Sequence, residues 1–310
     1  MIALAVYLVS EAGWSAVDLD LHTGPTLSGW ATVGMMAGAI AIVVPYFSGP
    51  MLNFGDFARY GRSFGAVKRG NVLGLPVNFL FFLVLTVVCA SATVPVFGEL
   101  ITDPIETVER IDAPVAILLG GVTFVTATVG INIVANFIAP AFDFSNVSPQ
   151  KIGWQAGGMV AAVGSVLLTP WNWYDNADGI RFSLGILGSL IGPLFGILIA
   201  GYYVCSRQRI AVDDMYSMSP RGRYWFRNGY NPNAVIAIAA AGIPTILLTL
   251  FASVGDYGWF IGCALGFTVF VGLERVRPMI PVLDPTEPGI SDGARAWCTC
   301  RSSTPTPPRR

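Results

Sequence analysis

The stretch AIAIVVPYFSGPMLNFGDFARY, residues 39–60, places prolines and glycines inside an apolar run. Pro45 and Pro50 remove backbone donors from any helix built there, so its hydrogen-bond ladder is predicted to break at about mid-membrane. Secondary transporters hold their substrates at such discontinuous helices. A single proline in a membrane helix is more often a simple kink. The two prolines that flank Tyr46 and Phe47 favour the functional interpretation.

The composition around this stretch indicates a membrane protein. The chain has 310 residues, of which 54% are apolar and only 12% are charged, whereas soluble domains carry roughly 25% charged residues. The formal net charge of -1 gives no reason to expect a nucleic-acid partner. We therefore predict an all-α membrane protein with membrane lipids around it.

Apolar segments that approach the roughly 20 residues needed for a span recur along the chain. The first residues, MIALAVYLVS, are predicted to be the end of a helix, because they lack the basic region of a signal peptide. Seven spans follow, at about 30–52, 72–96, 115–139, 154–168, 184–205, 234–251 and 257–273. The segment at 154–168 is short and rich in glycine, and its flanking tryptophans favour its assignment as a span.

The basic residues sort to one side of these spans. Alternating the connections places 16 of the 18 lysines and arginines on one face, and leaves Arg110 and Arg181 on the other. The positive-inside rule makes the first face cytoplasmic. The chain divides into a transmembrane domain, 1–273, and a cytoplasmic tail, 274–310. The tail ends in CTCRSSTPTPPRR and is predicted to be disordered.

Two asparagines lie within the span at 115–139. Asn132 and Asn136 are four residues apart, so their amides share one face of a helix with Thr128. A buried amide in hydrocarbon needs a partner. Hydrogen bonding between helices and substrate binding explain the pair equally well on pattern alone.

Asn53 and Asp56 follow the proline stretch at the cytoplasmic end of the predicted broken helix. An ion pair or cap involving Arg59 and a role in gating are equally compatible with Asp56. The carboxylates and amides in the turn after the asparagine span, Asp143 and Asn146, are interpreted as capping residues.

Three motifs resemble one known family. They are NFGDFARY at 53–60, GINIVAN at 130–136 followed by FDFSNVSP at 142–149, and SPRGRYWFRNGYNPNA at 219–234. Their order and their places between the spans are similar to those of the nucleobase:cation symporters, which include permeases for cytosine, purines, uracil, thiamine, allantoin and hydantoins. The resemblance covers about residues 1–273.

The resemblance implies a leucine-transporter-like bundle of inverted helical repeats. In that fold the span with Pro45 corresponds to the broken sixth helix, and the span with Asn136 to the eighth. By position, Tyr46 replaces the aromatic that stacks on the substrate ring, Pro45 is the neighbouring backbone position, and Asn136 is the amide that hydrogen-bonds the ring. The heterocyclic substrate is therefore expected to contact Pro45, Tyr46, Phe47, Asn132 and Asn136.

Two departures from the family pattern carry predictions. The positions that offer hydroxyls to sodium in sodium-coupled members match Gly130 and Ile131 here, so proton coupling is expected instead. No metal or other cofactor is expected. The resemblance also implies that the first four helices of the fold, and half of its binding site, are not in this chain.

The resulting prediction is a truncated secondary transporter of nucleobase-like heterocycles, working by alternating access in a cytoplasmic (inner or plasma) membrane. The alternative is a non-transporting membrane subunit, or an inactive remnant, that needs a partner to supply the missing helices. An enzyme is not expected, because the sequence contains no intramembrane cluster of catalytic residues.

Overall fold

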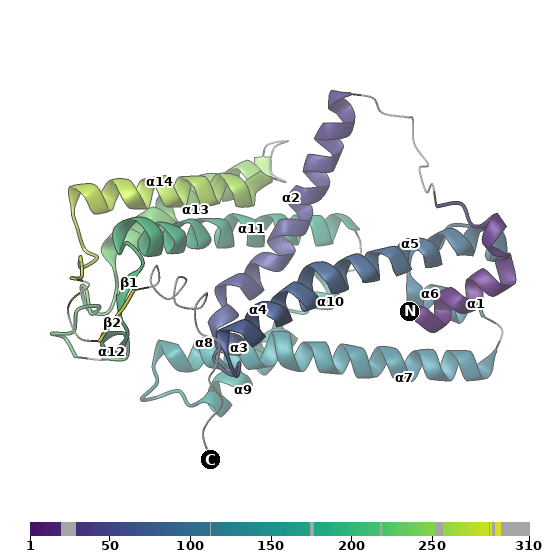
Figure 1. Cartoon of the computed structure of the whole chain (residues 1–310), viewed down its shortest axis with the longest axis horizontal. Helices are drawn as coiled ribbons and strands as arrows, with labels where there is room; N and C mark the ends of the chain where they lie inside the picture. The colour runs from purple at the N-terminus through teal and green to yellow at the C-terminus, as the bar shows by residue number, and fades with distance from the viewer. Residues whose placement is uncertain are drawn as a thin grey trace, which may run out of the picture. The chain divides into compact units, whose positions relative to one another are not determined.

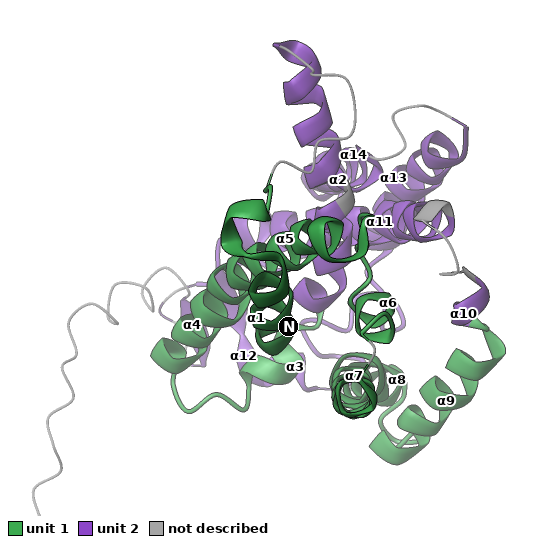
Figure 2. Ribbon diagram, turned by 90° about the vertical axis from the view of Figure 1, so that its right-hand side faces the viewer, with its two compact units in different colours: residues 1–27, 53–169 green, residues 28–52, 170–310 purple. Residues whose placement is uncertain are grey.

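A computed structural model describes residues 1–19, 29–111, 113–173, 177–217, 219–251, 257–284, 286 and 289–292. The chain forms two compact units, which Figure 2 shows in different colours. Unit 1 comprises residues 1–27 and 53–169, and unit 2 comprises residues 28–52 and 170–310. Each unit is described here by itself.

Unit 1 is entirely helical in its described part (Figure 1). Its α-helices are α1 (Ile2–Ala12), α3 (Phe54–Ala58), α4 (Phe64–Val72), α5 (Asn78–Phe97), α6 (Pro104–Glu109), α7 (Pro114–Ile131), α8 (Ala139–Val147) and α9 (Trp154–Leu167). Two π-helical segments, Leu73–Val77 and Asn132–Ile138, join α4 to α5 and α7 to α8 without a break. The expected N-terminal helix is α1, which packs Leu8 against Ala92 of α5.

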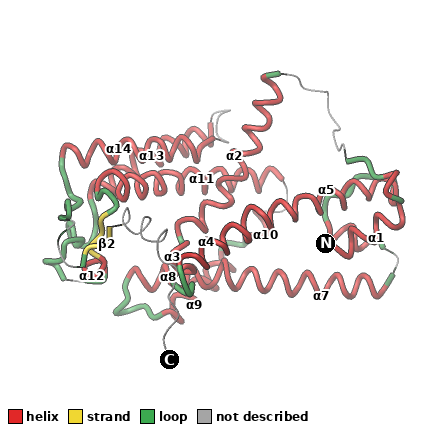
Figure 3. The backbone as a smooth tube through the Cα atoms, in the orientation of Figure 1, coloured by secondary structure: helices red, strands yellow, loops and turns green. Residues whose placement is uncertain are grey.

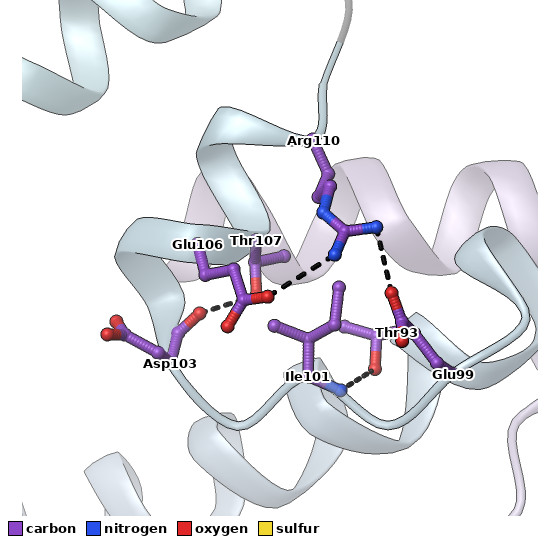
Figure 4. Close-up of polar contacts among 7 residues, drawn as sticks. All are labelled: Thr93, Glu99, Ile101, Asp103, Glu106, Thr107 and Arg110. Carbon is purple, nitrogen blue, oxygen red and sulfur yellow. Dashed lines mark hydrogen bonds and ion pairs between the residues drawn. The ribbon is translucent and has the colours of Figure 1, made fainter. Parts of the chain in front are cut away.

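A hydrogen-bonded network orders the connection between α5 and α7 (Figure 4). Arg110 reaches Glu99 at 2.8 Å and Glu106 at 3.4 Å, and all three side chains are exposed. Below them, the Thr93 hydroxyl accepts a hydrogen bond from the buried Ile101 amide at 2.9 Å. Exposed ion pairs contribute about 0–1 kcal/mol each, so the buried contact fixes this loop more firmly than the arginine does.

Unit 2 is a helical bundle whose centre is a close helix pair. Its main helices are α2 (Trp30–Leu52), α11 (Ala177–Ile199), α13 (Pro232–Phe251) and α14 (Gly258–Val276), with the short α10 (Pro170–Trp173) and α12 (Val212–Met215) and a π-helical segment, Ala200–Cys205. Along α11, Gly192 and Gly196 face the backbone of α14, and Gly266 of α14 faces Pro193. Small residues at four-residue spacing let membrane helices approach this closely.

In the segment after α14, the structure describes residues 277–284, 286 and 289–292. Strand β2 (Ile290–Asp292) pairs antiparallel with β1 (Arg209–Ala211), drawn in yellow in Figure 3. The Glu274 carboxylate accepts hydrogen bonds from the amides of Met279 and Ile280 at 2.9 and 3.0 Å. Residues 293–310 lie outside the described residues.

Six helices in the described part are long and apolar enough to cross a membrane, compared with the seven predicted. They are Trp30–Leu52, Phe64–Phe97, Pro114–Val147, Gly179–Cys205, Pro232–Phe251 and Gly258–Val276. The seventh predicted span is α9, which has 14 residues. At 1.5 Å per residue it is about 21 Å long, shorter than the roughly 30 Å hydrocarbon core.

Candidate functional site

The proline-containing helix α2 continues through both prolines as one helix from Trp30 to Leu52. The predicted break at mid-span is therefore a break in hydrogen bonding and not in the path of the chain. Proline's own φ is compatible with a helix, but its nitrogen cannot donate to the carbonyl four residues earlier. The carbonyls of Ala41 and Tyr46 thus lose their usual donors, while the helix continues to Leu52.

Pro45 anchors α2 to the bundle of unit 2 and leaves Tyr46 outside it. The Pro45 side chain is buried and lies beside Gly188 of α11, where an added β-carbon would be 3.1 Å from the proline ring. The Tyr46 side chain is 66% exposed. Its ring meets Phe47 edge-on, with 5.1 Å between centroids. Tyr46 therefore presents an exposed aromatic face, whereas the Pro45 ring is buried in the bundle.

Asn132 and Asn136 lie in the π-helical segment that joins α7 to α8. As their spacing predicts, they share one face: the Asn136 amide nitrogen donates to the Asn132 carbonyl oxygen at 2.6 Å. Asn132 in turn donates to the Thr128 backbone carbonyl at 2.8 Å. Both asparagines are exposed within unit 1. π-helical turns often occur at functional sites.

The ladder formed by Thr128, Asn132 and Asn136 has a direction. Each amide donates toward the N-terminal end, so the last member keeps its carbonyl oxygen unused. Among the described residues, nothing else bonds to the Asn136 side chain, which retains one acceptor oxygen and one N–H. An amide with both is complementary to a ring edge that offers a carbonyl beside an N–H.

The predicted gating residues join α3 to α8 within unit 1. Asn53 donates to the Asp143 carboxylate at 3.0 Å, and the Arg59 guanidinium lies 4.1 Å from the centroid of Phe142. Asp56 forms a 3.7 Å ion pair with Arg59. We name this set of contacts the α3–α8 junction. It ties the segment from Asn53 to Arg59 to α8, which follows the π-helical segment that carries the asparagine ladder.

Sequence reasoning assigned Asp143 only a capping role and missed its contact with Asn53. A signal was present, because Asp143 lies seven residues, or two helical turns, beyond Asn136 on the same face. The reading of Asp56 as an ion-pair partner of Arg59 agrees with the observed contact. In the described part of the chain, no group of three or more His, Cys, Asp or Glu is arranged to hold a metal ion.

The profile of the family described as permeases for cytosine/purines, uracil, thiamine and allantoin matches residues 1–272. The chain belongs to this family. Membership and the six apolar helices make it a multi-pass membrane protein.

Named relatives agree with this assignment. The chain is 29% identical over 284 residues to an allantoin permease of Bacillus subtilis, covering 88% of this chain and 58% of that protein. It is 31% identical over 247 residues to a purine-uracil permease of Arabidopsis thaliana, covering 79% of this chain and 38% of that protein. The chain thus spans between about two fifths and three fifths of the length of these two relatives.

A solved structure, the inward-facing conformation of Mhp1, matches 90% of this chain with a TM-score of 0.61 at 20% sequence identity. The match covers 60% of that chain. It shows that this permease-family chain has the leucine-transporter-like helical fold.

Proposed function

We propose that the protein is a secondary active permease for nucleobase-like heterocycles of the purine, pyrimidine, allantoin or hydantoin class. The observation that carries the proposal is the asparagine ladder, whose last member, Asn136, keeps one acceptor oxygen and one N–H and is exposed on an apolar helix of 34 residues, Pro114–Val147. An amide in this setting needs a polar partner. The family match over residues 1–272 supports a heterocyclic substrate as that partner.

The substrate contacts follow from the chemistry of the exposed groups. Tyr46 offers an aromatic face for a planar ring, with the neighbouring Phe47 holding it edge-on. Asn136 offers a donor and an acceptor, and Asn132 fixes its orientation through their mutual hydrogen bond. Pro45 contributes through the backbone that it alters and not through its buried ring. Pro45, Tyr46 and Phe47 belong to unit 2, and Asn132 and Asn136 belong to unit 1.

The α3–α8 junction is proposed to take part in gating at the cytoplasmic end. Asn53 and Asp56 belong to the short helix and turn that follow α2, and they reach α8 through Asp143 and Arg59. Opening that end requires the Asn53–Asp143 hydrogen bond to break. This proposal places the C-terminus in the cytoplasm, as the distribution of lysines and arginines predicts, in an inner or plasma membrane.

The test is uptake of radiolabelled allantoin, uracil and hydantoin by transport-deficient cells. One arm expresses the chain as it stands, and the other a chimera in which residues 1–273 replace the matching part of the Bacillus subtilis allantoin permease. Uptake by the chimera supports the proposal. A folded, membrane-inserted chimera without uptake contradicts it and favours the non-transporting subunit, and activity of the first arm shows that no partner is needed.

Asn136→Ala is expected to lower uptake by the chimera by about tenfold to a hundredfold, because a substrate hydrogen bond left unmade in a buried site costs about 1–3 kcal/mol. The measurement is initial uptake rate against substrate concentration. Thr126→Val is the matched control: this hydroxyl lies on the same helix and bonds back to the Val122 carbonyl at 2.7 Å. An equal loss in both variants would show a general effect on α7.

Uptake is expected to persist when sodium is replaced by choline, and to fall when a protonophore removes the pH gradient. Gly130 and Ile131 match the positions that offer hydroxyls to sodium in sodium-coupled members of the family. Neither residue has a side-chain oxygen for a hard cation. Comparing both conditions in the same cells checks the coupling ion. Strict dependence on sodium would refute proton coupling while leaving the substrate proposal intact.

A further inference from the structure

Trp259 at the start of α14 carries a buried donor that the bundle does not use. The side chain is 8% exposed, and its indole nitrogen has no acceptor among the described residues. The ring itself is held firmly, with centroids 5.5 Å from Phe195 and 5.0 Å from Phe260. Leaving a buried N–H unpaired costs about 1–3 kcal/mol, so such a group calls for an explanation.

The backbone of α2 has one carbonyl, that of Ala41, without its usual helical donor. Pro45 cannot donate to the carbonyl of Ala41, and the ring of a proline lies against the carbonyl four residues before it. Ala41 is fully buried. The nearby Ser48 hydroxyl is already bonded to the Val44 carbonyl at 2.8 Å. It therefore does not replace the missing donor of Ala41.

Gly188 of α11 lies beside both Pro45 and Trp259. A β-carbon added to Gly188 would lie 3.1 Å from the Pro45 ring and 3.5 Å from the Trp259 β-carbon. Pro45 and Trp259 therefore flank the same point on α11, and α2 and α14 also contact each other directly. Pro45 and the buried Trp259 therefore lie at one three-helix contact inside unit 2, and Ala41 is about one helical turn from Pro45 on α2.

We propose that Trp259 is a positioning residue for Tyr46: its indole N–H is the donor for the Ala41 carbonyl when α2 bends at Pro45. In the straight conformation described above, α2 continues through Pro45 and the Trp259 N–H is not bonded to the Ala41 carbonyl. In the bent conformation the Trp259 N–H bonds to the Ala41 carbonyl, which stabilises the opened backbone of α2. The bend also turns the aromatic face of Tyr46, which is one residue after the hinge. This inference rests on the proposed function, because Tyr46 matters only if it contacts substrate.

The direct test is amide hydrogen exchange of residues 46–49 in the full chain, compared in four proteins: the parent, Trp259→Phe, Pro45→Ala and the double variant. The exchange rate of these amides reports the population of the bent conformation. Phenylalanine keeps the ring and removes only the donor. Exchange is expected to slow by roughly fivefold to thirtyfold in Trp259→Phe, the factor that 1–2 kcal/mol produces in an equilibrium.

The Pro45→Ala background separates positioning from packing. Alanine restores a backbone donor to the Ala41 carbonyl, so adding Trp259→Phe should then change nothing further. The control is Ser183→Ala, which removes another buried group without a partner in the described part, on α11, and should leave exchange at 46–49 unaltered. Equal slowing in both backgrounds, or none in either, overturns the inference.

Uptake by the chimera tells the two proposals apart. Trp259→Phe is expected to reduce uptake in the Pro45 background and to have no further effect beside Pro45→Ala. A parent chimera without uptake, together with the expected exchange pattern, refutes the transport function and retains the hinge. Normal uptake by every variant, with exchange unchanged, refutes the hinge and retains the transport function.

Discussion

Gly196→Leu is expected to abolish the folded state of unit 2. A β-carbon at this position would overlap the carbonyl oxygen of Cys263 and lie 2.9 Å from the Phe267 nitrogen. These are backbone atoms of α14, which no rotamer change moves aside. The two helices must separate along their whole length, and the contacts on either side, at Gly192 and Gly266, are lost together.

The size of this effect follows from the packing. Overpacking a well-filled core costs about 1–3 kcal/mol where side chains are able to yield, and more is expected where backbone meets backbone. We expect no monodisperse protein for Gly196→Leu in size-exclusion chromatography, and a lowered thermal midpoint for Gly196→Ala. The matched control is Gly272→Ala on α14, where an added β-carbon meets nothing within 4 Å. A Gly196→Ala variant as stable as this control would show that the helices are not in backbone contact.

Glu274→Ala is expected to release the segment that follows α14. The carboxylate is only 8% exposed. It accepts a hydrogen bond from Asn233 of α13 at 2.7 Å, in addition to those from the Met279 and Ile280 amides. Asn233 is itself buried and also donates to the Arg277 carbonyl at 2.8 Å. Removing the carboxylate leaves three donors without their acceptor, the buried Asn233 amide and the two part-buried backbone amides.

Each buried donor left unsatisfied costs about 1–3 kcal/mol, so the loss in unfolding free energy should be about 2–4 kcal/mol after partial solvation. Limited proteolysis between residues 277 and 292 is expected to accelerate accordingly, with Glu274→Gln intermediate because it keeps one acceptor oxygen. Glu109→Ala removes an exposed carboxylate from unit 1 and serves as the control. Proteolysis of the Glu274→Ala variant at the parent rate would show that β2 alone holds the segment.

The membrane class and the helices that cross it follow from hydropathy, because the bilayer requires a continuous apolar run and tolerates few exceptions. The ladder of Asn132 and Asn136 was equally accessible, since a four-residue spacing has one geometric meaning in a helix. The π-helical turn that contains them was not accessible, because no composition distinguishes it from an α-helix.

Contacts between distant segments account for the rest of what the sequence left open. Nothing in the sequence pairs Asn53 with Asp143, or Asn233 with Glu274, since each pair depends on how two helices lie. The break expected at Pro45 followed from the missing donor alone. The helix persists because proline's φ is compatible with a helix, and the Pro45 ring packs beside Gly188.

The two helices of 34 residues in unit 1, Phe64–Phe97 and Pro114–Val147, are far longer than a membrane is thick. Each is about 51 Å long at 1.5 Å per residue, against roughly 30 Å of hydrocarbon. The surplus belongs to the polar ends, where Lys68 and Arg69 begin one helix and Asp143 ends the other. We therefore expect the α3–α8 junction to lie at the level of the lipid headgroups, where dissolved ions reach it. Its Asp56–Arg59 ion pair should weaken as ionic strength rises, and the thickness of the host membrane should set how far the junction projects into water.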